Sequence, residues 1–246
     1  MKVVVAKDYN ELSFKAAQLI AEQITKKRNS VLGLATGSTP EGMYKELIHL
    51  NQENKVDFSK VVTFNLDEYY GLSPEHPQSY YFFMWNKFFK YINIKKENVH
   101  LLNGITGNID KECSQYENLI KKSGKIDLQI LGIGDNGHIG FNEPDISLNT
   151  KTHVVNLTTK TIRANSRFFS IHQEKVPKKA ITMGIGTIMR AGKIILLANG
   201  KRKARVIEKT INGLVTTKVP ATVLQLHNDV TIIVDREAAS QFKDQR

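Results

Sequence analysis

The alternation of short apolar runs with helix-like segments along the whole chain constrains the fold most strongly. Short runs rich in Val and Ile are typical of buried parallel strands, and the stretches between them carry apolar residues at helical spacing. This pattern predicts an α/β fold, a Rossmann-like three-layer sandwich with a mostly parallel central sheet between helices. The expected strands span 2–6, 31–35, 60–66, 126–133, 180–184, 193–198 and 229–234.

Two of the intervening segments have clear helix signals. Asp8 and Glu11, three residues apart, form a capping pair at the start of a helix with one apolar face. The aromatic-rich segment 80–91 has helical spacing, and we expect an amphipathic helix that covers the sheet rather than a platform for stacking bases.

Length and composition restrict the class of protein. A chain of 246 residues with 41% hydrophobic content can bury one large core, and no linker or repeat divides it, so a single domain over 1–246 is expected. The chain has no signal-peptide-like opening and no run of eighteen apolar residues, which predicts a cytoplasmic protein with no membrane partner. The net charge is +11, but the lysines are scattered, so we expect no nucleic-acid partner. Cys113 is the only cysteine and is expected to be structural.

Ligands of open α/β sheets bind at the carboxyl ends of the strands, so the loops that follow the strands matter most. The loop after the strand at 126–133 places His138, a base near neutral pH, close to Glu143, a carboxylate that can orient it. Its glycines also match the dinucleotide fingerprint. However, Asn142 and Pro144 interrupt the helix that this fingerprint requires, and no acidic residue stands about 20 positions further on. We therefore expect no nucleotide cofactor.

The loop after the strand at 31–35 resembles an anion-binding cradle. Gly37 frees the backbone, Ser38 and Thr39 add hydroxyls, and Pro40 suits the first turn of the next helix. An ordinary helix cap in a glycine turn is the alternative. No Gly-Lys-Ser/Thr follows, so the segment is not a nucleoside-triphosphate P-loop.

Two further sites supply charged side chains. Asp67 and Glu68 follow the strand at 60–66, and because successive strand side chains alternate, only one is expected to enter the cleft. Arg167 and Lys203 lie downstream, and one cation from each segment could complete the phosphate cradle, although singly each could be surface charge.

Taken together, these loops resemble the glucosamine-6-phosphate deaminase family closely and over nearly the whole chain. The resemblance implies conversion of D-glucosamine 6-phosphate and water to D-fructose 6-phosphate and ammonia in amino-sugar catabolism, with neither metal nor organic cofactor. The matching segments, in the family's order and spacing, are Thr36 to Pro40, Asn65 to Tyr69, Gly134 to Pro144, Ala164 to Phe169 and Leu224 to His227.

The resemblance also implies roles for individual residues. His138 would open the sugar ring, with Glu143 orienting the imidazole, and Asp67 would remove the proton at C2 of the open chain. The substrate phosphate would be held by a clamp, and residues at about 157–180 would form a mobile lid that closes over the site. The implied clamp residues are Gly37, Ser38, Thr39, Arg167 and Lys203.

Two positions depart from many relatives. Asn136 stands where aspartate is common, and because an amide does not titrate, Asn136 can only hydrogen-bond and orient. The neighbouring Asp135 is expected to face away and not to replace it. His153 and Val155 stand where activated relatives carry basic residues, which predicts little or no activation by N-acetylglucosamine 6-phosphate.

The sequence leaves rivals open. A related sugar-phosphate isomerase or lactonase, or a catalytically silent sugar-phosphate-sensing module, could use the same sheet, and neither an isomerase nor a lactonase would release ammonia. The resemblance leaves both a monomer and a homo-oligomer open.

Overall fold

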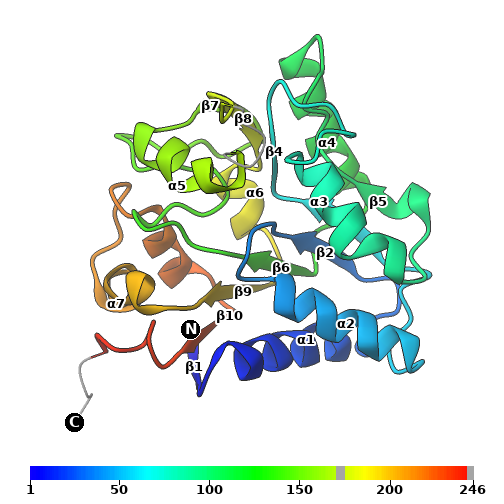
Figure 1. The fold of residues 1–246 in the computed structure, drawn as a ribbon, viewed down its shortest axis with the longest axis horizontal. Helices are drawn as coiled ribbons and strands as arrows, with labels where there is room; N and C mark the ends of the chain where they lie inside the picture. Colours follow the sequence, from blue (N-terminus) through cyan, green and yellow to red (C-terminus); the bar gives the residue numbers. More distant parts are fainter. Residues whose placement is uncertain (170–174, 243–246) are drawn as a thin grey trace.

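The computed structural model describes residues 1–169 and 175–242. A sheet of seven strands, with every neighbouring pair parallel, forms the centre of the fold (Figure 1). The predicted α/β sandwich is confirmed. In spatial order the strands are β1 (Lys2–Ala6), β10 (Val230–Asp235), β9 (Lys193–Ala198), β6 (Leu128–Leu131), β2 (Val31–Leu34), β3 (Val62–Asn65) and β5 (Val99–His100).

Helices cover both faces of this sheet. Crossovers between parallel strands are right-handed, so helices whose connections run toward β5 share one face, and helices whose connections return toward β1 cover the other. Figure 1 shows α1 and α2 side by side on one face. The first set is α1 (Tyr9–Lys26), α2 (Glu41–Gln52) and α3 (Tyr80–Lys87), and the second is α4 (Ile109–Lys122), α6 (Ile185–Met189) and α7 (Ala204–Asn212).

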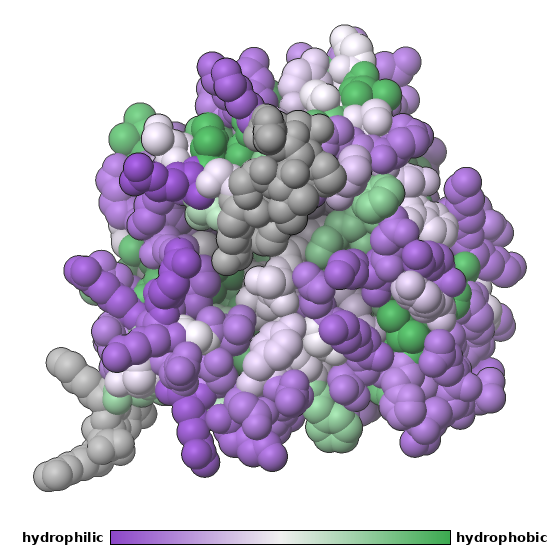
Figure 2. Space-filling model, viewed as in Figure 1, coloured by the Kyte–Doolittle hydropathy of each residue, from purple (hydrophilic) through white to green (hydrophobic). Residues whose placement is uncertain are grey.

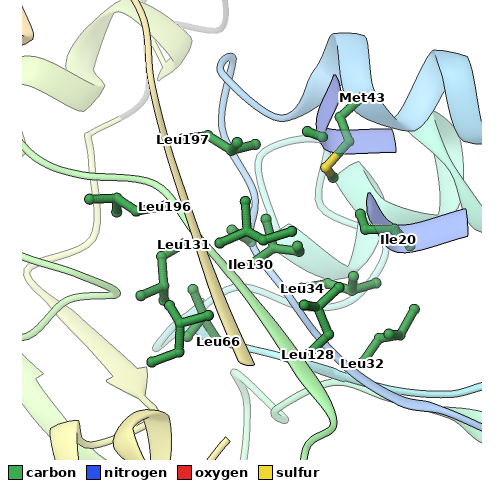
Figure 3. Close-up of a cluster of buried hydrophobic side chains, with 14 of the residues drawn as sticks. Ile20, Leu32, Leu34, Met43, Leu66, Leu128, Ile130, Leu131, Leu196 and Leu197 are labelled. Carbon is green, nitrogen blue, oxygen red and sulfur yellow. The ribbon is translucent and has the colours of Figure 1, made fainter. Parts of the chain in front are cut away.

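The core forms where the helical stripes meet the central strands. Asp8 caps α1 by accepting the backbone NH of Glu11, as the sequence predicts. In Figure 3, Ile20 of α1 and Met43 of α2 lie on the side of β2 that carries Leu34, and all three side chains are buried. Burial of this apolar surface on both faces of the sheet holds the strand ends in fixed positions.

A second, smaller sheet stands beside the first. It contains β4 (Asp67–Tyr69), β8 (Lys179–Thr182) and β7 (His153–Asn156), all antiparallel. The strand predicted at 180–184 therefore exists but lies outside the central sheet, which instead includes the two-residue β5. The chain crosses between the sheets at Leu66, whose NH bonds to the carbonyl of Leu34 in β2 while its own carbonyl accepts from Met183.

Helix α5 (Thr159–Phe169) packs on the small sheet through a separate apolar cluster. This helix lies within the lid predicted at 157–180, of which residues 170–174 lie outside the described residues. A cluster of buried aromatic and aliphatic side chains fastens α5 to β4 and β8. Its members are Tyr69, Phe141, Leu157, Phe169, Val176 and Ala180.

Short 3-10 helices complete the chain: η1 (Phe89–Tyr91), η2 (Lys96–Asn98), η4 (Lys201–Lys203) and η5 (Pro220–Leu226). The predicted aromatic helix is α3 followed by η1, with Phe88 and Phe89 buried in the core. Figure 2 shows one face of the molecule, on which hydrophilic side chains dominate and hydrophobic ones form small separate groups. Within residues 1–169 and 175–242, no helix has the length and apolar character needed to cross a membrane.

Candidate active site

The loops singled out in the sequence meet at the carboxyl ends of β2, β3, β6 and β9. The chain leaves β2 toward one face of the sheet and leaves β6 toward the other, and these two strands are neighbours. A crevice at such a switch point is the usual ligand site of an open α/β sheet.

A tight turn after β6 places His138 at this edge of the sheet. The NH of Gly134 donates to the carbonyl of His138 at 2.9 Å, and Gly137 closes the turn with a φ of 90°. A Cβ added to Gly134 would lie 2.1 Å from Cε1 of His138. Glycine at this position therefore lets the imidazole ring lie against its own turn. No helix opens at these glycines, which agrees with the rejection of a dinucleotide fingerprint.

Asn136 links the imidazole to the carboxylate of Glu143. The side-chain oxygen of Asn136 lies 2.7 Å from Nδ1 of His138, and its amide donates to Oε2 of Glu143 at 2.6 Å. Nδ1 lies 3.4 Å from the same Oε2, so the nearer partner of the ring is the amide. An amide oxygen only accepts, so we assign the imidazole proton to Nδ1, which leaves Nε2 free to act as a base.

Glu143 is also held by residues at the start of α5. Thr161 in the first turn of α5 donates to Oε1, and the hydroxyl of Thr158 lies 3.3 Å from the same oxygen. Burial alone would raise the pKa of this carboxyl. The hydrogen bond and charge of His138, with hydrogen bonds from Thr161 and Asn136, instead lower it to about 2. Glu143 is therefore an anion near neutral pH, and it joins the turn after β6 to α5.

Asp67 has the opposite surroundings. It is 6% exposed, and in the described part of the chain its carboxylate makes no hydrogen bond. Burial, together with the negative charge of Glu68, raises its pKa to about 8. A Cβ placed on Gly140 would be 3.6 Å from Oδ2 of Asp67, so the loop that carries His138 passes directly beside this carboxylate.

Glu68, the other member of the acidic pair, points elsewhere. Its carboxylate accepts the backbone NH groups of Tyr69, Tyr80 and Tyr81 at 2.8 to 2.9 Å, the last two in the first turn of α3. Burial raises its pKa to about 7, although these three donors act to lower it. Glu68 therefore stabilises the start of a helix, and the two neighbouring carboxylates have different surroundings, as strand alternation leads one to expect.

The predicted anion cradle lies between β2 and α2. Gly37 has a φ of 99°, and the backbone NH groups of Gly37, Ser38 and Thr39 donate to no acceptor within the described residues. The hydroxyl of Thr39 donates to the side-chain oxygen of Asn199 at 2.7 Å, which ties the cradle to the loop after β9. Thr39 would therefore serve an anion through its NH group, at the start of a helix whose dipole favours negative charge.

Lys203 in η4 belongs to that same β9 loop. Its ammonium is 2.6 Å from Oδ1 of Asp135, and Arg202 contacts Oδ2 of the same carboxylate at 2.5 Å. Asp135 thus has other partners than its neighbour Asn136, which contacts His138 and Glu143. Arg167 lies on α5 beyond Thr161, and its side chain lies outside the described residues.

Several residues of the site escaped the sequence analysis. The sequence does not identify Thr161 and Asn199 as site residues, because a single Thr or Asn in a polar segment carries no distinctive signal. Tyr69, whose hydroxyl accepts from Asn165 of α5 at 2.8 Å, lay within a recognised motif but had no role assigned. Cys113 is buried, and burial raises the pKa of its thiol to about 11, which fits a structural residue.

The fold and the candidate site indicate a class of protein: an acid–base enzyme on a Rossmann-like α/β sheet, with the predicted anion cradle at the end of the neighbouring strand β2. Comparison with known proteins specifies the family. Residues 7–233 match the family described as glucosamine-6-phosphate isomerases/6-phosphogluconolactonase, and the chain belongs to this family.

Relatives of high identity cover the chain from end to end. The glucosamine-6-phosphate deaminase of Thermoanaerobacter sp. (strain X514) is 64% identical over 245 residues, which are 100% of this chain and 96% of the relative. That of Clostridium acetobutylicum is 59% identical over 98% of this chain and 100% of its own length.

Solved structures agree with the fold. A monomeric glucosamine-6-phosphate deaminase superposes with a TM-score of 0.95 at 48% identity, covering 98% of this chain and 100% of its own. The 6-phosphogluconolactonase of Trypanosoma cruzi superposes with a TM-score of 0.76 at 21% identity, covering 98% of this chain and 97% of its own. The second likeness concerns the fold alone.

Proposed function

We propose that this chain is a glucosamine-6-phosphate deaminase, which converts D-glucosamine 6-phosphate and water to D-fructose 6-phosphate and ammonia. Full-length relatives at 57 to 64% identity carry this name. The observation that supports the chemistry best is that an oriented imidazole, His138, precedes Gly140 by two residues, while Asp67, a buried carboxylate of raised pKa, lies beside Gly140. The reaction is an isomerisation coupled to hydrolysis, and water is its only co-reactant.

In this proposal, His138 opens the sugar ring. With its proton on Nδ1 and accepted by Asn136, the neutral ring has Nε2 available to take the proton of the anomeric hydroxyl and return it to the ring oxygen. Asn136 and Glu143 then act as positioning residues. The anionic Glu143 stabilises the imidazolium that forms when the ring carries both protons.

Asp67 is the base of the isomerisation step. The hydrogen at C2 of the open-chain sugar is a weak acid, and a carboxylate with a pKa near 8 is a stronger base toward it than an exposed aspartate would be. Removal of this proton forms an enolamine, reprotonation at C1 forms an imine, and water releases ammonia from it. The rings of Tyr69, Tyr80 and Phe141 pack against one another, and burial and the charge of Asp67 both act to raise the pKa of Tyr69 and of Tyr80, so this base lies near buried aromatic side chains.

The phosphate end of the substrate is assigned to the cradle at Gly37, Ser38 and Thr39, completed by Lys203 and by Arg167 of the lid. The phosphate lies at the far end of the sugar from C2, so holding it fixes the orientation of the reacting carbon. Closure of a lid that includes α5 would also act on Glu143 through Thr161.

The direct test is to incubate purified protein with glucosamine 6-phosphate and to measure ammonia and fructose 6-phosphate. The expected result is equal amounts of both products, and Asp67→Asn serves as the matched inactive control. Binding of the sugar phosphate without ammonia release would instead favour the silent sensing module. Turnover of a phosphogluconolactone with no release of ammonia from the amino sugar would favour the lactonase.

A further inference from the structure

Among the acidic residues of the candidate site, Asp135 is the one that pairs with Lys203, a cation of the proposed phosphate clamp, and with its neighbour Arg202. Its two carboxylate oxygens contact different cations, Lys203 at 2.6 Å and Arg202 at 2.5 Å. Within the described residues its side chain makes no other hydrogen bond. It is 23% exposed and Lys203 is 22% exposed, so this contact is only partly accessible to solvent.

The contact changes the charge that an incoming phosphate meets. Lys203 and Arg202 carry two positive charges, and Asp135 leaves the group of three with a net charge of one. A sugar phosphate carries close to two negative charges at neutral pH, so it must share the ammonium of Lys203 with a carboxylate that repels it. Arg202 is 74% exposed, which weakens its contribution through screening by solvent.

We propose that Asp135 is a built-in counter-ion of the phosphate clamp, which lowers the affinity of the site for the phosphate of both substrate and product. The inference rests on the proposed function of Lys203. Substrate and product carry the same phosphate, so tighter binding of that group acts on both alike and slows departure of the product. The carboxylate of Asp135 holds Lys203 in position when no phosphate is bound, and it limits how tightly the clamp binds a phosphate.

The test replaces Asp135 by asparagine, which keeps the size of the side chain and an oxygen that accepts from Lys203. The dissociation constant of inorganic phosphate is measured by calorimetry for the wild-type and D135N proteins. We expect D135N to bind phosphate roughly fivefold more tightly, the effect of removing one partly exposed charge. KM for glucosamine 6-phosphate should fall by a similar factor while kcat does not rise.

Asp229→Asn is the matched control, because it makes the same change of charge at an exposed position just before β10, at the opposite end of the sheet. This variant should leave the affinity for phosphate unchanged. Equal or weaker binding of phosphate by D135N would overturn the proposal and leave Asp135 a structural contact. If D135N does not fold, Asp135→Ala makes the same test of charge, with the same two outcomes.

Failure of this inference can be told apart from failure of the proposed function. If the wild-type protein releases ammonia and Lys203→Met weakens its binding of phosphate, the clamp is established whatever D135N does. If Lys203→Met binds phosphate as the wild type does, the clamp assignment is wrong, and the inference falls with it.

Discussion

Asp67 and Glu143 are chemically similar, nearly buried carboxylates of the candidate active site, and their surroundings drive their pKa values apart. Glu143 is bonded to Asn136, Thr161 and the imidazole of His138, and its pKa falls to about 2. Asp67 makes no hydrogen bond within the described residues, faces the charge of Glu68, and its pKa rises to about 8.

Burial is common to both carboxylates, so burial alone does not decide their chemistry. The presence of donors decides it: a carboxylate that accepts several hydrogen bonds remains an anion, whereas one without donors becomes a proton acceptor near neutral pH. The comparison assigns proton removal from carbon to Asp67, and orientation of the imidazole to Glu143 acting with Asn136.

The largest effect is expected from Asp67→Asn. The variant keeps the shape of the side chain but cannot accept the proton, so kcat should fall by about 10² to 10⁴ while substrate still binds. Steady-state release of ammonia measures the loss. Glu68→Gln is the neighbouring control, which should reduce thermal stability more than turnover because Glu68 accepts three backbone NH groups. Normal turnover by Asp67→Asn would contradict the assignment of proton removal to Asp67.

The pH dependence of kcat/KM should show the raised pKa of Asp67. The free enzyme must have Asp67 ionised, so kcat/KM should fall about tenfold for each unit of pH below about 8. The measurement is initial rates at low substrate from pH 5.5 to 9. A rate constant that is flat over this interval would show that the crevice does not hold Asp67 protonated.

Stability should depend on pH in the opposite direction. The folded-state pKa of Asp67 lies above the ordinary value of 3.8, so its protonated form favours folding below that value, and this contribution is lost as pH rises toward about 8. Asp67→Asn should remove this loss and raise the melting temperature near pH 8. Glu143 acts with the other sign, since its contribution is present above pH 4.5 and lost as pH falls toward 2.

A smaller effect is expected from Asn136→Ala. His138 would lose the acceptor at Nδ1, and kcat should fall roughly tenfold because the base is still present but less well oriented. Asn136→Asp restores an acceptor but places a second carboxylate against Glu143, so its rate profile should gain a new dependence at acid pH. Unchanged kcat in Asn136→Ala would mean that Glu143 alone orients the ring.

The smallest effect is expected from N-acetylglucosamine 6-phosphate as an effector. Val155 is half-buried on β7 against the apolar cluster of the small sheet, and burial lowers the pKa of His153, which favours its neutral form. Neither residue offers a positive charge to a phosphate. Substrate saturation curves with and without the effector should coincide, and a saturable several-fold drop in half-saturation would contradict this prediction.

Much of the site was predictable because its signals are local. His138 and Glu143 lie five positions apart, and the turn from Gly37 to Pro40 predicts the start of the helix that follows it directly. Strand alternation predicted that only one of Asp67 and Glu68 would face the cleft, and the family resemblance chose Asp67. The hydrogen bonds that give these residues their pKa values were not predictable, because their partners come from other elements: Thr161 from α5 for Glu143, and the first turn of α3 for Glu68.

The class of fold, six of the seven strands of the central sheet and the loops that carry chemistry could be predicted from the amino-acid sequence, because apolar periodicity and turn residues act over a few neighbouring positions. Two features depend on tertiary packing: the strand at 180–184 pairs with β4 and β7 in a second sheet, and Asp135 contacts Lys203, 68 positions away. Pairing of strands and of distant charges depends on which surfaces the packed core brings together, and no local pattern encodes it.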